Sequence, residues 1–286
     1  TARPWPGAVA LYSSPQDYDF VLQDVLNKRS IVGQLTTPLL RGPTGVWDRQ
    51  EGVNVKLVSG SLASVDTASL FSGANTIAVG DGTADNWEIN QFAQAEVSGV
   101  REYEISQMLR GQAGTTAMIE DVWPAGSFVV VLDERPKQIT IPSASRGLDR
   151  HYRYDPAKSV VGSASFKHVV YAFKGNGYRP YPVTHLRATE VANGLTFTWI
   201  RATRIDGDLW SAGDVPLGED SELYQVTVYQ SRLVKRQTVS STASWTYPAS
   251  QQASDLVFGG FEVAVAQVSG RYGAGSAMSI DIASQA

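Results

Sequence analysis

The fold class is indicated by the stretch Trp199-Ile-Arg-Ala-Thr-Arg-Ile-Asp-Gly-Asp-Leu-Trp210 and by Tyr224-Gln-Val-Thr-Val228, which follows it. Apolar and polar residues alternate at the start, where Leu195, Phe197 and Trp199 share one face of an extended segment and threonines share the other. A charged loop that contains glycine separates the two alternating runs. Two half-buried strands joined by a long acidic loop are typical of a β-sandwich with that loop exposed at its end.

Similar runs recur to the C-terminus, and they predict a sandwich domain. The strand candidates are residues 195–200, 223–229, 232–239, 243–247, 261–267 and 277–282. This spacing is that of a fibronectin type III-like or immunoglobulin-like sandwich of about 100 residues. The clearest linker is Gly175-Asn-Gly177 with Pro180 and Pro182. We therefore expect one domain over residues 1–184 and a fibronectin type III-like domain over residues 185–286.

The N-terminal part also reads as strands, with less regular spacing. Expected strands are residues 6–12, 17–26, 30–36, 53–57, 76–79, 87–92, 95–97, 102–109, 128–132, 137–141 and 166–173. The apolar run 128–132 suits a strand buried on both faces. Residues 62–71 predict one short helix capped by Ser64 or Asp66, and residues 143–165 predict a loop. The expected fold class is all-β, with an irregular N-terminal β-domain before the sandwich.

Composition excludes several classes of function. The chain has 286 residues, of which 18% are charged, and its formal net charge is −4, so it has no basic field to attract nucleic acid. It has no cysteine, which excludes disulfides and cysteine-based metal sites. No apolar run approaches the roughly 20 residues that a membrane-spanning helix needs. The chain begins with Thr1 and without a secretory signal pattern, so we interpret it as a segment of a longer protein.

A series of short motifs, in order along nearly the whole chain, resembles a known family. They are Pro6-Gly-Ala-Val9, Gly42-Pro-Thr44, Val46-Trp-Asp-Arg49, Trp87-Glu-Ile-Asn-Gln-Phe92, Leu109-Arg-Gly-Gln-Ala-Gly-Thr115, Met118, Pro124-Ala-Gly126, Val131-Leu-Asp133, Arg146-Gly-Leu148, His185-Leu-Arg-Ala188, Arg201 to Asp208, and Asp214-Val-Pro-Leu-Gly-Glu219. Together they resemble the C-terminal region of the host-specificity, or baseplate hub (megatron-like), tail-tip protein of gene transfer agents and related siphophages. Met108 and Thr116 depart from the family pattern, which usually has an aliphatic or an acidic residue at such positions.

The resemblance implies a non-enzymatic segment of a phage-like tail tip or baseplate. It implies a place in the tail of a virion or virus-like particle, a homotrimer, contacts with other baseplate and tail proteins, and a surface that faces the bacterial envelope or its glycans. The family's glycosidase-like barrel and hub domains lie upstream of the segment seen here. Their activity is therefore not expected of this chain.

The search for catalytic and metal-binding patterns finds none that the residues support. His151, His168 and His185 lie far apart in the sequence and lack the short spacings of metal sites, so no metal and no cofactor is expected. We place His168 in a strand, half-exposed, and His185 at the domain junction. No Gly-x-Ser-x-Gly elbow and no phosphate-binding loop is present, so we expect no enzyme activity.

Five residues are the candidates for an interface or recognition site: Trp210, Asp206, Asp208, Arg110 and Tyr178. The acidic loop that holds Asp206 and Asp208 suits either a Ca²⁺ site or, more plainly, a solvated turn whose charges Arg201 and Arg204 neutralise. Arg110 suits either an anion site or a structural salt bridge, and Trp210 either an interface or a plug at the sandwich end. Tyr178 belongs to a group of tyrosines near the junction whose exposed faces suit sugar stacking or protein contacts.

A second class of function stays open on sequence alone. Fibronectin type III-like sandwiches also accompany glycosidases, so the chain could be a carbohydrate-binding accessory module of a cell-surface-active hydrolase. A coplanar strip of exposed Trp and Tyr side chains would favour that module, whereas apolar surfaces that match other chains would favour the tail-tip segment. A secreted adhesin fragment is a third alternative, but it explains none of the motifs.

Overall fold

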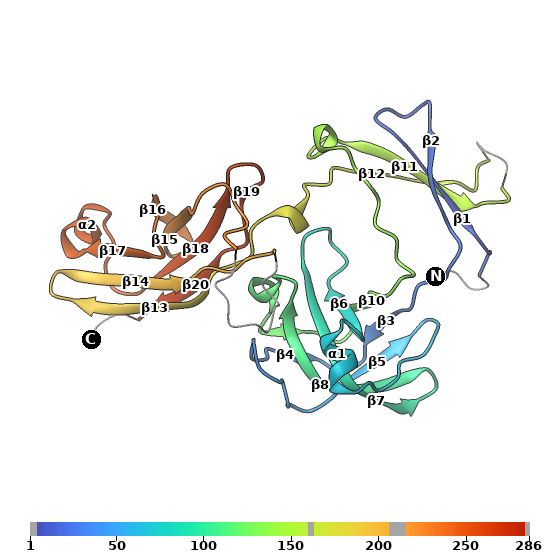
Figure 1. Cartoon of the computed structure of the whole chain (residues 1–286), viewed down its shortest axis with the longest axis horizontal. Helices are drawn as coiled ribbons and strands as arrows, with labels where there is room; N and C mark the ends of the chain where they lie inside the picture. Colours follow the sequence, from blue (N-terminus) through green and yellow to red (C-terminus); the bar gives the residue numbers. More distant parts are fainter. Residues whose placement is uncertain (1–4, 160–162, 206–215, 284–286) are drawn as a thin grey trace. The chain divides into compact units, whose positions relative to one another are not determined.

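The computed structural model describes residues 5–159, 163–205 and 216–283, and the expected all-β class is confirmed (Figure 1). The chain forms two compact units. Unit 1 comprises Thr1–Gln112 and Met118–Gly175, and unit 2 comprises Ala113–Ala117 and Asn176–Ala286. No helix among the described residues is long and apolar enough to cross a bilayer.

Most of unit 1 is a closed barrel. Its strands follow the order β10-β3-β5-β8-β7-β6, and every pair is antiparallel. Their bounds are β3 Val32–Leu35, β5 Val53–Leu57, β6 Thr76–Gly80, β7 Trp87–Gly99, β8 Glu102–Gln112 and β10 Phe128–Val131. Closure leaves no unpaired sheet edge in this part of the chain. The two candidates at 87–92 and 95–97 prove to be one long strand, β7.

The barrel interior follows from alternation along its strands. In β5, Val53, Val55 and Leu57 are buried and face inward, while the residues between them are more exposed. The same core holds Ile77, Phe92, Ile105, Met108, Trp123 and Val129. Strand β10 differs from its expected burial on both faces, because Phe128 is 39% exposed and Val129 is buried. A barrel strand has one inner and one outer face, so an apolar run in it does not imply two buried faces.

The short helix predicted within residues 62–71 is confirmed as α1, Thr67–Phe71. Asp66 caps it, because its carboxylate Oδ1 accepts a hydrogen bond of 2.7 Å from the backbone N–H of Ser69. At the other end, the side-chain amide of Gln91 donates to the carbonyl oxygens of Leu70 and Ala74. Both ends of this one-turn helix are therefore satisfied, and Leu70 is fully buried.

Unit 1 also contains an antiparallel four-stranded sheet in the order β12-β11-β1-β2. Its strands are β1 Val9–Ser14, β2 Val21–Leu26, β11 Arg150–Pro156 and β12 Lys167–Tyr171. The expectation of a loop over 143–165 is wrong for β11, which alternates buried Tyr152 with more exposed neighbours. The expected strand at 137–141 is wrong as well, because these residues have no strand partner in the part of the chain that is described.

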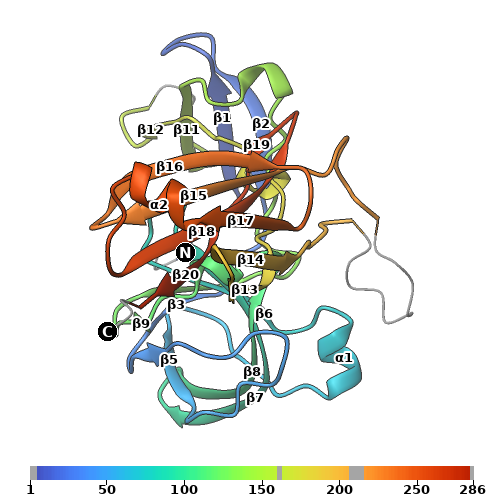
Figure 2. The same cartoon turned by 90° about the vertical axis from the view of Figure 1, so that its left-hand side faces the viewer.

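Unit 2 is a fibronectin type III-like sandwich. One sheet has the order β13-β14-β17, and the other has the order β16-β15-β18, with β19 and β20 also paired to β18. The bounds are β13 Thr184–Val191, β14 Gly194–Ile200, β15 Tyr224–Gln230, β16 Leu233–Ser240, β17 Ser244–Pro248, β18 Phe261–Ser269, β19 Gly273–Ala274 and β20 Met278–Ile282. Figures 1 and 2 show these strands from two sides, with the helix α2 Ala249–Ser254 at one end of the sandwich.

Aromatic packing between the two sheets fills the sandwich core. Trp199 is buried, as its position in the alternating run predicts, and its ring meets that of Tyr224 edge-on at 5.1 Å. Trp245 is only half-buried and stacks between Phe197 and Tyr247. The Trp199–Tyr224 contact joins the two sheets, because Trp199 is on β14 and Tyr224 on β15, whereas the contacts of Trp245 lie within the sheet of β14 and β17. The sequence missed β13, in which charged and polar residues hide the alternation.

A polar clasp closes one side of this core. The guanidinium of Arg236 donates to both carboxylate oxygens of Asp255, over 2.6 and 2.8 Å, and the hydroxyl of Tyr247 donates to Asp255 Oδ2 over 2.7 Å. The Asp255 side chain is only 10% exposed. The hydrogen bonds from Arg236 and Tyr247 outweigh its burial and hold the pKa of Asp255 below its ordinary value.

We predict that Asp255 stabilises unit 2 in a pH-dependent way. Because its folded pKa is lowered, its contribution is complete above the unfolded carboxyl pKa, about 3.9. The contribution is lost as the pH falls through the lower folded value. Thermal unfolding should therefore show a lower Tm for Asp255→Asn than for wild type at neutral pH, and the difference should shrink in strong acid.

Asp281→Asn is the matched control, because Asp281 is an exposed carboxylate on β20 of the same unit. Its effect on stability should stay within about 0.5 kcal/mol at every pH. An Asp255→Asn deficit that stays constant from neutral to strongly acidic solution would contradict the clasp.

Candidate functional site

The five candidate recognition residues differ in what the structure says of them. Asp206, Asp208 and Trp210 lie outside the described residues. Tyr178 is 49% exposed, and its ring stacks on that of Tyr272 at 5.4 Å. Arg110 lies within the barrel strand β8 rather than in a turn, and it is 1% exposed. A buried guanidinium cannot serve as a surface recognition group, so we interpret Arg110 as structural.

Arg110 is the centre of a buried ion network. Its Nε donates to Glu88 Oε1 over 2.7 Å, its Nη2 donates to Glu88 Oε2 over 2.9 Å, and its Nη1 donates to Asp48 Oδ2 over 3.0 Å. Nη1 also donates to the carbonyl oxygen of Leu40. The indole N–H of Trp123 donates to Glu88 Oε2 over 2.7 Å. The network thus joins two carboxylates, one guanidinium and one indole in the barrel interior.

The guanidinium of Arg110 and the two carboxylates around it stabilise each other electrostatically. Burial alone would lower the pKa of Arg110, but the hydrogen bonds and charges of Glu88 and Asp48 outweigh it and raise that pKa above its ordinary value. Arg110 is therefore cationic at every accessible pH. The pair with Glu88 is bidentate, which is the strongest geometry for an arginine and a carboxylate. Such a pair is compatible with burial because its hydrogen bonds are satisfied.

The charged residues of this network come from three of the short motifs in the sequence. Asp48 belongs to the piece that also contains Gly42, Glu88 to residues 87–92, and Arg110 to residues 109–115. Gly42 takes part through its missing side chain, because a Cβ there would lie 2.3 Å from Asp48 Oδ2 and 2.7 Å from Arg110 Nη1. These three motifs therefore supply the charged residues from which the buried network is built. Asp48, Glu88 and Arg110 are buried and paired with one another in the barrel.

Two glycines after Arg110 have a backbone conformation with positive φ. Gly111 and Gly114 have φ values of +61° and +78°, a region that favours glycine. Gly114 also packs on the ring of Tyr181, where a Cβ would lie 2.1 Å from Tyr181 Cδ1. The motif at 109–115 therefore combines one buried charge with two positive-φ glycines, one of which, Gly114, leaves no room for a side chain.

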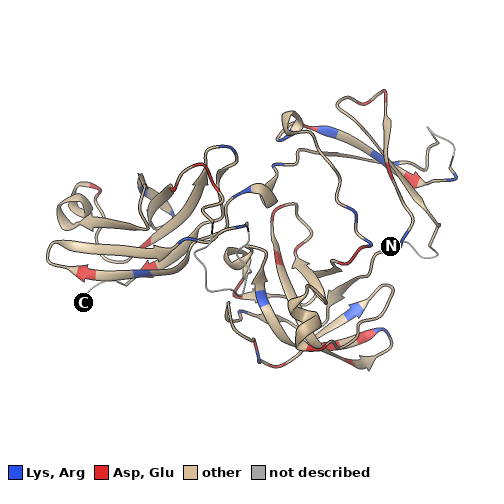
Figure 3. Ribbon diagram, viewed as in Figure 1, with Lys and Arg blue, Asp and Glu red and all other residues tan. Residues whose placement is uncertain are grey.

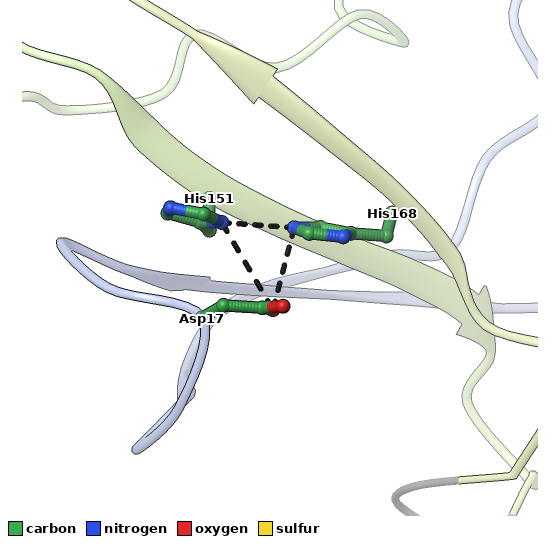
Figure 4. Close-up of side chains that lie close together, drawn as sticks. All are labelled: Asp17, His151 and His168. Carbon is green, nitrogen blue, oxygen red and sulfur yellow. Dashed lines mark hydrogen bonds and ion pairs between the residues drawn. The ribbon is translucent and has the colours of Figure 1, made fainter.

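A second polar group lies on the four-stranded sheet and was not expected. Asp17, His151 and His168 each offer one donor atom, and these atoms lie within 4.8 Å of one another (Figure 4). His151 Nδ1 and His168 Nε2 are 3.0 Å apart, and the two rings stack. Asp17 Oδ1 lies 3.9 Å from His151 Nδ1 and 3.5 Å from His168 Nε2.

Strand pairing brings the two histidines together. His151 lies on β11 opposite Val170 of β12, and His168 lies opposite Arg153. The histidines are thus diagonal neighbours on one face of an antiparallel pair, within reach of long side chains. Asp17 lies in the turn between β1 and β2. Because β1 pairs with β11, this turn lies close to the two histidines. Arg153 donates to Asp17 Oδ1 over 2.9 Å and lies over the ring of Phe20.

The sequence does not predict this cluster, because its pattern indicates a loop over residues 143–165, where the structure has strand β11. Separation along the chain says nothing about distance once two strands pair, and only the register of β11 on β12 places these histidines side by side. The alternation of His151, Tyr152, Arg153 and Tyr154 is the signal that could have revealed β11. His168 lies in a strand as expected, with a side chain 34% exposed. His185 is exposed on β13 rather than packed.

Two described acidic residues that lie in loops, Glu219 beside the acidic loop and Asp81 in unit 1, have protein partners. Glu219 accepts from Arg204 Nε over 3.1 Å. Asp81 accepts from the backbone and hydroxyl of Thr83 and from Asn86. These contacts hold the pKa of Asp81 below its ordinary value. Both geometries are those of ordinary charged turns.

In the comparisons with known proteins, the family match covers the barrel region of unit 1. A family model described as "Rcc01698-like, C-terminal" matches residues 30–130, which span the barrel from just before β3 into β10. A search of the curated proteins found no match at the significance threshold used. Among solved structures, the rat CD45 extracellular region, domains d3-d4, aligns over 54% of this chain and 72% of that chain at 13% identity, with a TM-score of 0.28. Such a superposition gives no guide to function.

We predict that removing the buried cation destabilises the barrel strongly. Arg110→Met leaves Glu88 and Asp48 as uncompensated buried carboxylates, which costs about 3–5 kcal/mol of unfolding free energy. Chemical denaturation of the full chain measures this loss.

Arg41→Met is the matched control for an exposed ion pair. Arg41 Nε lies 2.7 Å from Asp121 Oδ1, and both side chains are more than half exposed. Its loss should cost less than about 1 kcal/mol. Equal effects of the two substitutions would show that the network contributes no more than a surface pair.

Proposed function

We propose that the chain is a non-enzymatic structural and host-recognition segment of a phage-like tail tip, of the kind found in gene transfer agents. One observation carries the proposal. Three motifs that resemble the tail-tip family supply the charged residues of the buried barrel network, and the segment matched by the Rcc01698-like model contains all three. The resemblance therefore rests on residues that build the fold, which are hard to share by chance.

The chemistry of the buried carboxylates supports a non-enzymatic role. Asp48, Glu88 and Asp155 are the buried acidic residues among those described. Asp48 and Glu88 bind Arg110, and Asp155 accepts a hydrogen bond from the hydroxyl of Ser165. A general acid or base needs a group free to exchange a proton with substrate. These three carboxylates instead hold their own structural partners.

Charge and surface composition suit a role in assembly. Figure 3 shows acidic and basic residues interspersed along each unit rather than gathered in one segment, so no strong field of one sign is expected. Apolar side chains are exposed at the tip of the β7–β8 hairpin, where Val97 and Val100 are 76% and 82% exposed. Exposed apolar residues at a protruding tip suit burial against a neighbouring tail protein.

The carbohydrate-module alternative finds less support in the aromatic residues. Each of the six tryptophans that the structure describes is buried or half-buried. Tyr178 is exposed, but one of its faces is covered by Tyr272, and the other exposed tyrosines, Tyr18, Tyr154 and Tyr171, lie in unit 1. Sugar-binding platforms present open aromatic faces, and none of these tryptophans offers one. We therefore favour protein partners over free polysaccharide.

The proposal predicts assembly with tail proteins. The purified chain, mixed with the other tail-tip proteins of its particle, should co-elute with them as a larger complex in size-exclusion chromatography with light scattering. The homotrimer that the resemblance implies should appear as a threefold mass. Isolated envelope polysaccharide should not retain the chain. A stable monomer that does not co-elute with the tail proteins but binds polysaccharide would contradict the proposal.

The hairpin tip offers a sharper version of this test. Val97→Ser with Val100→Ser should weaken co-elution while leaving Tm nearly unchanged, because both side chains are exposed. Leu233→Ser with Val234→Ser is the matched control, since these apolar residues on β16 are 65% and 58% exposed and belong to unit 2. Equal losses from both pairs would mean that the hairpin has no special role.

A further inference from the structure

We propose that Asp17, His151 and His168 form a binding site for a divalent transition-metal ion, with Zn²⁺ as the best match. The inference does not depend on the proposed function. It rests on the convergence of three donor atoms from three separate elements: the turn between β1 and β2, strand β11 and strand β12 (Figure 4).

The spacing of the donor atoms fits metal coordination. Zinc binds imidazole nitrogen and carboxylate oxygen at about 2.0–2.2 Å, which places tetrahedral ligands about 3.3–3.6 Å apart. The three separations here are 3.0 Å between the two nitrogens, and 3.5 and 3.9 Å from Asp17 Oδ1 to His168 Nε2 and His151 Nδ1. They bracket the expected value, so small side-chain rotations bring all three donors to one ion.

The donor types select the class of metal. Two imidazoles and one carboxylate suit zinc, copper or nickel, whereas Ca²⁺ and Mg²⁺ prefer sites built from oxygen alone. Three protein ligands leave a tetrahedral ion with a fourth position for water. The Asp17 side chain is 54% exposed, and those of His151 and His168 are 24% and 34% exposed. An ion can therefore enter from solvent.

The surroundings of the cluster hold the donors in place. Arg153 donates to Asp17 Oδ1 over 2.9 Å, and its guanidinium lies 4.3 Å from the centre of the Phe20 ring. Phe20 in turn meets the ring of His168 edge-on. A carboxylate has about four acceptor positions, so Asp17 can accept from Arg153 and bind a metal at the same time. Hydrogen bonds of this kind orient metal ligands in known sites.

Metal binding would fasten one end of the four-stranded sheet. At present the two imidazoles share one hydrogen bond, and Asp17 is held chiefly by Arg153. An ion that replaces the proton between the imidazoles would also tie the β1–β2 turn to β11 and β12. Because a ligand that binds only the folded state stabilises it, Zn²⁺ should raise the Tm of the full chain.

The test uses the whole 286-residue chain after removal of any affinity tag and treatment with chelator. We expect isothermal titration with Zn²⁺ to give about one site per chain and differential scanning fluorimetry to show a rise in Tm. In His168→Asn the shorter amide cannot reach the position of Nε2, so binding should weaken at least tenfold and the Tm rise should disappear.

His185→Asn is the matched control, because it removes an imidazole outside the cluster at an exposed position where φ is +52°. It should bind Zn²⁺ as the wild type does. Asp17→Asn separates metal binding from a folding defect, since it keeps the shape of the side chain but removes its charge, and its affinity should also fall. Absence of zinc uptake by the wild type, or equal uptake by His168→Asn and wild type, would overturn the proposal.

Discussion

The positive charge of Arg110 inside the barrel is the constraint on which the rest of unit 1 depends. A buried guanidinium is stable only when carboxylates and carbonyl oxygens surround it, so β7 must deliver Glu88, and the segment before β5 must deliver Asp48. Gly42 must lack a side chain for that segment to approach. Trp123 then fills the remaining space and satisfies Glu88 through its indole N–H. The contacts of the Arg110 guanidinium on β8 thereby connect this strand to β7, to the segment before β5 and, through Glu88, to Trp123.

The buried barrel network and the candidate metal site occupy different parts of unit 1. The charged residues of the network lie within the segment matched by the family model, whereas several of the family-like motifs lie outside it. The His151–His168 pair lies on the four-stranded sheet, outside residues 30–130. The buried barrel network and the candidate metal site therefore share no residue. Fold and site are separable in this sense.

Alternation made the sandwich predictable. Its strands β14, β15, β16, β17, β18 and β20 fall at the expected places, because each has one face on a shared core, as Phe197 and Trp199 show. The helix cap at Asp66 was predictable for a local reason, since the capping bond spans three residues. The cluster of Asp17, His151 and His168 depends on strand register across distant segments, which no local pattern encodes. For Arg110 the sequence predicted only part of the result. A structural salt bridge was one of its two alternatives, but the burial of Arg110 within strand β8 was not predicted.

The central claim is that the buried ion network, and not apolar packing alone, determines the barrel. A double-mutant cycle with Arg110→Met and Glu88→Gln, followed by chemical denaturation, tests it most directly. The account predicts that Glu88→Gln destabilises the wild type but stabilises the Arg110→Met variant, because it removes an uncompensated buried charge, with a coupling free energy above about 1 kcal/mol. Additive effects of the two substitutions, within about 0.5 kcal/mol, would contradict the claim.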